Sequence, residues 1–140
     1  MTATTKSYTD VAHFAAAHRI TANVQAAMSN PYAPEWTDAD HWKVTLRRET
    51  PQGLRTMVTY FSQGYGHNGK APKLTAVLET LILDSNVLTM RDFADWCDEY
   101  GYNADSLKDR KTYDATRKLA ERFRRWLGPL FDELSGIENV

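Results

Sequence analysis

The stretch DFADWCDEYGYNADSLKDRKTYDATRKLAERFRRWLG, residues 92–128, decides the fold and carries the strongest charge pattern of the chain. It predicts a short acidic helix, a polar turn and a long basic helix. Over residues 76–104 one basic residue stands against six acidic residues, whereas residues 105–128 hold eight basic and four acidic residues. Because the whole chain has a net charge of −1, this segregation is local, and we expect it to form a surface that meets a partner.

Capping residues indicate where both helices of this stretch begin and end. Thr89, with Asp92 three residues later, predicts the start of the acidic helix, and Gly101 predicts its end. The long helix is placed at residues 106–127, because Gly128 is followed by a proline. Its core-facing stripe has helical spacing and comprises Tyr113, Thr116, Leu119, Ala120, Phe123, Trp126 and Leu127.

The preceding part of the chain predicts an antiparallel hairpin among helices. Two β-rich runs, residues 41–49 and 54–61, flank a Thr-Pro-Gln-Gly turn. A hairpin alone is marginal in water, so it needs helices or a third strand, for which the segment around Tyr32 is a candidate. Helical spacing predicts further helices at residues 10–28 and 73–83. The expected architecture is α+β, a single small domain with about four helices.

Composition limits the class of protein. A chain of 140 residues, 42% of them hydrophobic, is large enough for one folded domain with its own core. Cys97 is the lone cysteine, which excludes an intramolecular disulfide and a thiolate zinc cluster and favours a small core residue. Residues 1–7 are expected to be flexible, and residues 129–140 to form an acidic tail.

The sequence predicts a cytoplasmic protein that does not enter a membrane. The first ten residues, MTATTKSYTD, lack the apolar core of a signal peptide. No segment approaches the roughly 18 consecutive apolar residues that a membrane-spanning helix requires.

No catalytic or metal-binding motif stands out. The glycine-rich loop at residues 62–72, SQGYGHNGKAP, differs from a phosphate-binding loop in spacing and has Ala71 and Pro72 where a hydroxyl residue is required. His67 lies within that loop but has no neighbouring set of acid, base or ligand residues. We therefore predict no cofactor, no metal and no enzymatic activity.

The acidic helix offers a candidate partner-binding face, formed by Asp95, Trp96, Asp98 and Glu99. Its inner face is assigned to Phe93, Cys97 and Tyr100, which leaves Trp96 as an exposed aromatic anchor. Three interpretations of the carboxylates stay open: a solvated face, internal salt bridges to the basic helix, or a surface that imitates the phosphates of nucleic acid in a basic groove of another protein.

The basic helix offers a candidate nucleic-acid surface. The residues that lie away from its core stripe and could neutralise phosphates are Arg110, Arg117, Lys118, Arg124 and Arg125. Interspersed acidic residues and a pI of about 6.4 argue against this function. The GYNADS link is also longer than the tight turn of a helix-turn-helix motif.

Residues 60–128 combine four features: the Ser-x-Gly-x-x-His loop at residues 62–67, a leucine-rich helix that ends in aspartate, the string WCDEYGYNADSLK at residues 96–108, and a tyrosine followed by a basic helix that ends in R-x-L-G. In these features the segment resembles a group of small proteins from phages, prophages and plasmids. The resemblance implies a mobile-element origin and no known catalysis. Small proteins of this kind often bind and blunt host machinery, including CRISPR effectors.

The leading hypothesis is therefore a non-enzymatic mobile-element protein that binds a host protein or nucleoprotein complex and inhibits a defence system such as CRISPR-Cas. The alternative is a nucleic-acid-binding accessory protein that uses the basic helix at residues 106–127. An enzyme that uses His67 ranks third.

Overall fold

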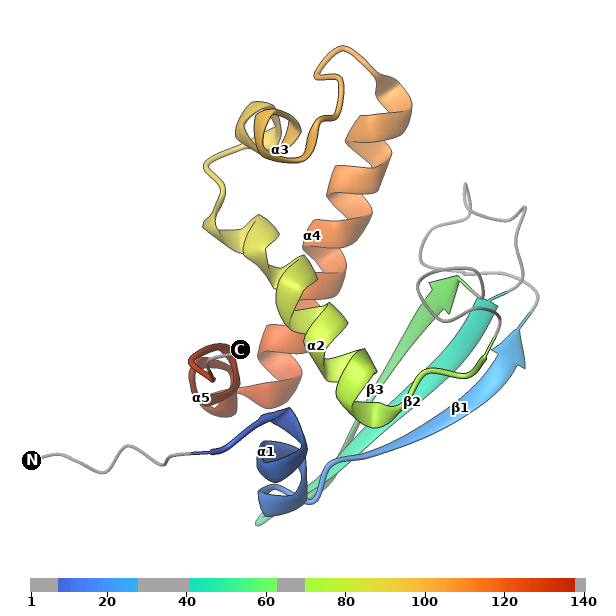
Figure 1. Cartoon of the computed structure of the whole chain (residues 1–140), viewed down its shortest axis with the longest axis vertical. Coiled ribbons are helices and arrows are strands. Elements are labelled where there is room, and N and C mark those ends of the chain that lie inside the picture. Colours follow the sequence, from blue (N-terminus) through green and yellow to red (C-terminus); the bar gives the residue numbers. More distant parts are fainter. Residues whose placement is uncertain (1–7, 28–40, 63–69, 138–140) are drawn as a thin grey trace, which may run out of the picture.

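A computed structural model describes residues 8–27, 41–62 and 70–137 of the chain. Within these ranges a short helix is followed by a sheet and then by a series of helices (Figure 1). The elements are α1 (Val11–Ala17), β1 (Thr21–Ala27), β2 (His41–Thr50), β3 (Gly53–Ser62), α2 (Leu74–Asp84), the 3-10 helix η2 (Ser85–Thr89), α3 (Phe93–Tyr100), α4 (Leu107–Leu127) and α5 (Leu130–Ser135). The α+β architecture expected from the sequence is confirmed.

The described strands form an antiparallel sheet in the order β1, β2, β3. Thr50 pairs with Gly53 across a two-residue turn. Gly53 has a φ of 118°, a backbone angle that residues with a Cβ rarely adopt. The predicted hairpin is therefore confirmed. On its inner face Val44 and Leu46 are fully buried, as the alternation of residues 41–49 indicated.

The predicted first helix at residues 10–28 was wrong in its second half. α1 ends at Ala17, and Arg19 has a φ of 54°, a left-handed conformation through which an α-helix cannot continue. From Thr21 onward the chain is β1, in which Ala22 and Val24 pack against the core. Ala22 and Val24 are two residues apart, as expected for one face of a strand, but Ala22 also fits the helical spacing that predicted a longer first helix. β1 is thus the additional strand that the hairpin was expected to need. The segment around Tyr32, which was the candidate for that strand, lies outside the described residues.

The main hydrophobic core lies between the sheet and the helices, which occupy one side of the sheet (Figure 1). Leu78 and Leu81 of α2 and Phe123 of α4 are fully buried there with the side chains of β2. Burial of each such side chain contributes about 1.5–3 kcal/mol. The predicted helix at residues 73–83 is confirmed as α2.

A second, smaller cluster holds α3 and η2 against α4. Asp92, not Thr89 as predicted, caps α3, because its carboxylate accepts from Asp95 N at 3.0 Å while the Thr89 hydroxyl donates to Asn86 O. Gly101, with a φ of 77°, ends α3 as predicted. The buried members of the cluster are Val87, Trp96, Cys97, Tyr113 and Ala120, which confirms that the lone cysteine belongs to the core.

Part of the expected acidic tail is folded. Residues 130–135 form α5, and Leu134 is buried in the main core. Asp132 and Glu133 lie in the first turn of α5, where the helix macrodipole favours carboxylates. The segment is therefore a packed helix whose charges suit its N-terminal end.

Arginines from the sheet bind the C-terminal end of α4. Arg48 donates from Nε and Nη2 to Trp126 O at 3.0 and 2.8 Å and from Nη2 to Leu127 O at 3.2 Å, and Arg55 Nη2 donates to Arg125 O at 3.2 Å. The remaining carbonyl of the last four accepts from Gly128 N. A helix otherwise leaves these four carbonyls without partners. Burial lowers the pKa of Arg48, and the Arg55 charge opposite lowers it further.

Replacing Arg48 by methionine tests this arrangement while keeping most of the side-chain volume. The Trp126 and Leu127 carbonyls would lose their donor in a buried site, so we expect a loss of about 3 kcal/mol in the free energy of unfolding. Urea denaturation measures it. Arg47→Met, at an exposed position on the same strand, is the control and should change stability by less than about 0.5 kcal/mol. Equal effects would contradict the role of Arg48.

Asp84, the last residue of α2, makes stability depend on pH. Burial raises the pKa of Asp84 to about 6, so its charged form is disfavoured in the folded protein. The charged carboxylate therefore lowers the free energy of unfolding above about pH 6, and this destabilisation disappears as the pH falls toward 4. We expect Asp84→Asn to stabilise by up to about 2–3 kcal/mol at pH 7 and by almost nothing near pH 4. Urea denaturation at both pH values checks this; a gain that Asp105→Asn reproduces would contradict it.

Candidate nucleic-acid interface

The outer face of α4 carries parallel rows of charge. Residues seven apart lie on nearly the same line along a helix, since seven residues make almost two turns. One row holds Arg110, Arg117 and Arg124, and a second holds Lys111, Lys118 and Arg125, with Asp114 and Glu121 between them. α4 as a whole has eight basic and three acidic residues. All five residues predicted as a nucleic-acid surface therefore lie on this outer face.

Two shallow depressions adjoin on this side of the molecule. One, of about 640 Å³, is bordered by Arg117, Arg124 and Arg125 together with Leu88 of η2. The other, of about 470 Å³, is bordered by Arg91, Arg110 and Arg117 together with residues of α3 and α4. Arg117 is common to both. We call the arginines that line either depression the arginine track: Arg91, Arg110, Arg117, Arg124 and Arg125.

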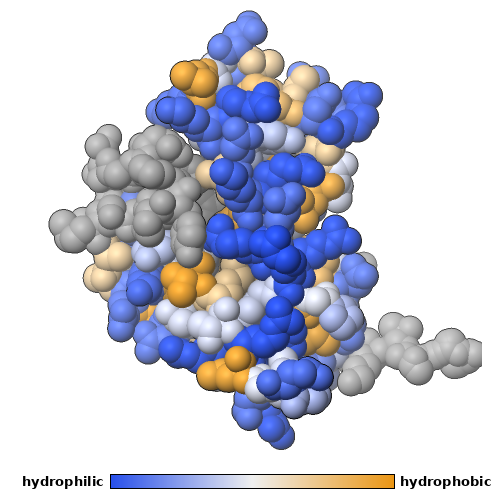
Figure 2. Space-filling model, turned by 180° about the vertical axis from the view of Figure 1, so that it is seen from behind, coloured by the Kyte–Doolittle hydropathy of each residue, from blue (hydrophilic) through white to orange (hydrophobic). Residues whose placement is uncertain are grey.

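Figure 2 shows this side of the protein, where hydrophilic side chains gather in a band over α4. Aromatic rings support some of the guanidinium groups from below. The Arg110 guanidinium carbon lies 5.1 Å from the centre of the Phe93 ring, and that of Arg124 lies 5.6 Å from the centre of the Phe131 ring. Such contacts are worth about 0.5–1 kcal/mol at exposed sites and hold the groups in place without neutralising them.

Some of these arginines form weak ion pairs with carboxylates of α4. Arg110 and Asp114 lie 3.4 Å apart, and Arg117 and Glu121 lie 3.6 Å apart, each pair on exposed positions of α4. Exposed pairs with this spacing contribute about 0.3–0.5 kcal/mol, so a stronger anion can displace them. Within the described ranges no ion pair involves Lys118, Arg124 or Arg125. The end of the arginine track near Gly128 therefore holds the least compensated charge.

Arg91 belongs to the track, and sequence reasoning missed it. It precedes α3 and makes a two-bond contact with Asp95, at 2.7 and 2.9 Å. The i,i+4 spacing to Asp95 was visible in the sequence. Its position beside Arg110 was not, because that depends on how η2 and α3 pack on α4.

The acidic face of α3 differs from its predicted form. Trp96 was predicted as an exposed anchor but is only 4% exposed, since it lies three residues from Phe93 on the helix and beneath the ring of Tyr102. Asp95 pairs with Arg91. Tyr100, predicted to face inward, is 46% exposed. Of the predicted partner-binding residues, Asp98 and Glu99 remain exposed.

No metal centre is formed by the described residues. Among them, no group of three or more His, Cys, Asp or Glu side chains could hold an ion. Burial raises the pKa of Cys97, and the nearby Asp109 and Asp98 carboxylates raise it further, so its thiol stays protonated. His67 and the centre of the glycine-rich loop, residues 63–69, lie outside the described residues.

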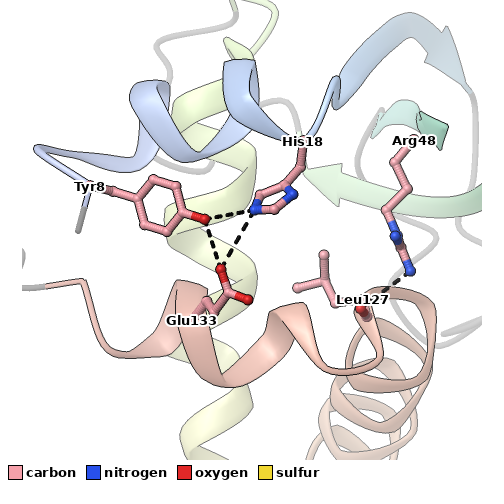
Figure 3. Close-up of polar contacts among 5 residues, drawn as sticks. All are labelled: Tyr8, His18, Arg48, Leu127 and Glu133. Carbon is pink, nitrogen blue, oxygen red and sulfur yellow. Dashed lines mark hydrogen bonds and ion pairs between the residues drawn. The ribbon is translucent and has the colours of Figure 1, made fainter. Parts of the chain in front are cut away.

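Tyr8, His18 and Glu133 form a polar cluster between α1 and α5 (Figure 3). The Tyr8 hydroxyl donates to Glu133 Oε1 at 2.7 Å and lies 2.8 Å from His18 Nε2. Because the hydroxyl has one proton, His18 Nε2 must be the donor to Tyr8. Burial and the Glu133 carboxylate raise the pKa of Tyr8 to about 12. This arrangement fastens the start of the described chain to α5.

These features define a small α+β domain with a basic helical face. No protein-family model, curated protein or solved structure matches the chain. In the part of the chain that the structure describes, no helix is both long enough and apolar enough to cross a membrane. The resemblance to phage and plasmid proteins stays a prediction.

Removing the Tyr8 hydroxyl tests the polar cluster. Tyr8→Phe loses its contacts to Glu133 and His18 while keeping the ring, so we expect a loss of about 1–2 kcal/mol in the free energy of unfolding at pH 7. Because the raised pKa of Tyr8 gives stability that is lost as pH rises from about 10 to about 12, the difference should shrink over that interval. Chemical denaturation measures both; Tyr100→Phe, at an exposed tyrosine, should stay near the wild type.

Proposed function

We propose that this protein is a non-enzymatic binding protein that contacts the phosphate backbone of nucleic acid along the arginine track. One observation supports this most directly: four arginines of α4, together with Arg91 just before α3, border two adjoining depressions. A planar guanidinium can make two parallel hydrogen bonds to one phosphate, which makes arginine the usual residue for such contacts.

The length of the track suits a polyanion better than a small anion. Residues 110–125 of α4 span about 22 Å at 1.5 Å per residue. One strand of duplex DNA places a phosphate about every 3.4 Å along its axis, so several phosphates would face the track at once. A single small anion would engage only one or two of the arginines.

The lining favours contact with the backbone over recognition of bases. Neither depression includes an Asn or Gln side chain among its described lining residues, although these amides are the usual readers of adenine. Asp92 and Glu121 are the carboxylates of the lining, and each would repel a phosphate. We therefore expect moderate affinity with little sequence preference.

The biological setting that we propose is a nucleoprotein complex of a host cell. The resemblance to small phage and plasmid proteins supports a mobile-element origin, and proteins of that kind often act by blunting host defence. Burial of Trp96 and pairing of Asp95 weaken the acidic face of α3 as the main contact. The arginine track then becomes the better-supported surface for such a complex, including a CRISPR effector.

Fluorescence anisotropy with labelled duplex and single-stranded DNA tests the proposal between about 50 and about 200 mM salt. With about four phosphate contacts, log K should fall with log salt at a slope of about −3 to −4. The double variant Arg117→Gln/Arg124→Gln should reduce the size of that slope by about 2.

Arg47→Gln/Lys73→Gln is the matched control, because it removes two exposed positive charges that lie outside the depressions. It should leave the slope near the wild-type value. Absence of binding at about 50 mM salt, or an equal loss in both double variants, would contradict the proposal.

A further inference from the structure

The turn between α3 and α4 exposes an unusual share of the apolar surface. Among the described residues five large hydrophobic side chains are exposed, and three of them fall within residues 100–107. They are Tyr100 at 46%, Tyr102 at 42% and Leu107 at 71% exposure. Figure 1 places this turn at the end of the molecule farthest from α1 and α5. We call these three residues, with Asp98, Glu99 and Asp105, the α3–α4 tip.

The tyrosines of the tip are held in place by buried rings. Tyr102 stacks on Trp96 with ring centres 4.3 Å apart and an angle of 2° between the planes, and Tyr100 lies 6.1 Å from the same ring. Trp96 in turn contacts Tyr113 of α4 at 5.4 Å. An aromatic side chain that is already ordered loses little freedom when it meets a partner, so more of its contact energy is available for binding.

The backbone of the tip is also ordered by hydrogen bonds. Gly101 N and Tyr102 N both donate to Cys97 O, at 2.9 and 3.0 Å. Asn103 N donates to the Asp109 carboxylate at 2.9 Å, which ties the turn to the first turn of α4. The exposed apolar side chains therefore project from an ordered backbone.

The turn itself carries acidic charge. Asp98, Glu99 and Asp105 are exposed, and residues 92–107 contain no Lys, Arg or His. The basic residues that flank this range are Arg91, which pairs with Asp95, and Lys108. Asp98 and Glu99 lie in the last turn of α3, where the helix macrodipole disfavours carboxylates. Their placement does not serve the stability of α3, and it suits an external cation.

We propose that the α3–α4 tip is a docking surface for a basic segment of a partner protein. An apolar side chain of the partner would sit against Tyr100 and Tyr102, and its Lys or Arg residues would face Asp98 and Glu99. Nucleic acid and anionic lipid carry the wrong charge for this surface. The inference is independent of the arginine track: the tip would meet the protein of a nucleoprotein complex, and the track its nucleic acid.

A phage-displayed library of short random peptides, selected on the full chain, tests the proposal without assuming the partner. We expect enriched peptides to combine Lys or Arg with an aromatic or aliphatic residue. Asp98→Lys/Glu99→Lys should weaken their binding at least about tenfold, and because the change suits the α3 macrodipole it should not lower stability. Glu79→Lys, at an exposed glutamate on α2, is the control and should bind as the wild type does.

A second variant separates the apolar contact from the charges. Tyr100→Ser removes an exposed ring and should weaken the same peptides at least several-fold, while Leu83→Ser, at another exposed apolar residue, should not. Peptides without basic residues, or equal binding to Asp98→Lys/Glu99→Lys, would overturn the proposal. So would concentration-dependent dimers that this variant abolishes, because the occupant would then be a second copy of the chain.

The two proposed surfaces can fail separately. Arg117→Gln/Arg124→Gln should keep peptide binding while losing DNA affinity, and Asp98→Lys/Glu99→Lys should not lose DNA affinity. Loss of both activities in either variant would contradict the assignment of two independent surfaces.

Discussion

The structure depends on the contact between two sheet arginines and the C-terminal end of α4. Arg48 and Arg55 lie directly opposite each other on β2 and β3, an arrangement of like charges that would weaken an isolated hairpin. Here both guanidinium groups donate to carbonyls of the last turn of α4, at the negative end of its macrodipole. The arginines of the hairpin therefore provide donors for the last carbonyls of α4, and these carbonyls offset the repulsion between the two arginines. This mutual contact fixes the relative position of the hairpin and the helix.

The macrodipole of α4 also makes the segregated charges of the chain compatible with a stable fold. Asp109 lies in the first turn of α4, and Arg124 and Arg125 lie in the last, which is the order that the macrodipole of α4 favours. Acidic residues at one end of the helix and basic residues along it thus stabilise the folded chain. The surfaces proposed for binding draw on the outer positions, where Asp98, Glu99 and Arg125 face solvent.

Much of the fold follows from local signals, and the errors arise where local signals are ambiguous. The hairpin, α2, the start of α4 at Ser106 and the glycine at the end of α3 are all set by neighbouring residues. Ala22 satisfies both a helical and a strand pattern, and only the left-handed backbone of Arg19 decides between them. The inward placement of Arg48 follows the alternation of β2, but its acceptors lie 78 and 79 residues away.

In the candidate site too, some features follow from local sequence and others depend on tertiary contacts. The exposed bases of α4 are evident from helical spacing alone, because solvent-facing positions on a long helix need no tertiary information. Helical spacing settles the position of Trp96 only in part. Its three-residue distance from Phe93 fits the inner face of α3, but its burial also depends on Tyr102, which stacks on it from beyond the end of α3, and on Tyr113 of α4. The contribution of Arg91 likewise exists only after α3 has packed on α4.

The seven-residue spacing of Arg110, Arg117 and Arg124 has a geometric consequence. An α-helix falls about 20° short of two full turns in seven residues, so the row rotates by about 40° around α4 from its first arginine to its last. A straight, rigid ligand can approach only part of such a row without stretching side chains. A strand that winds as it runs can follow all of it, so the handedness and curvature of the partner, as well as its charge, govern how many of the three it meets.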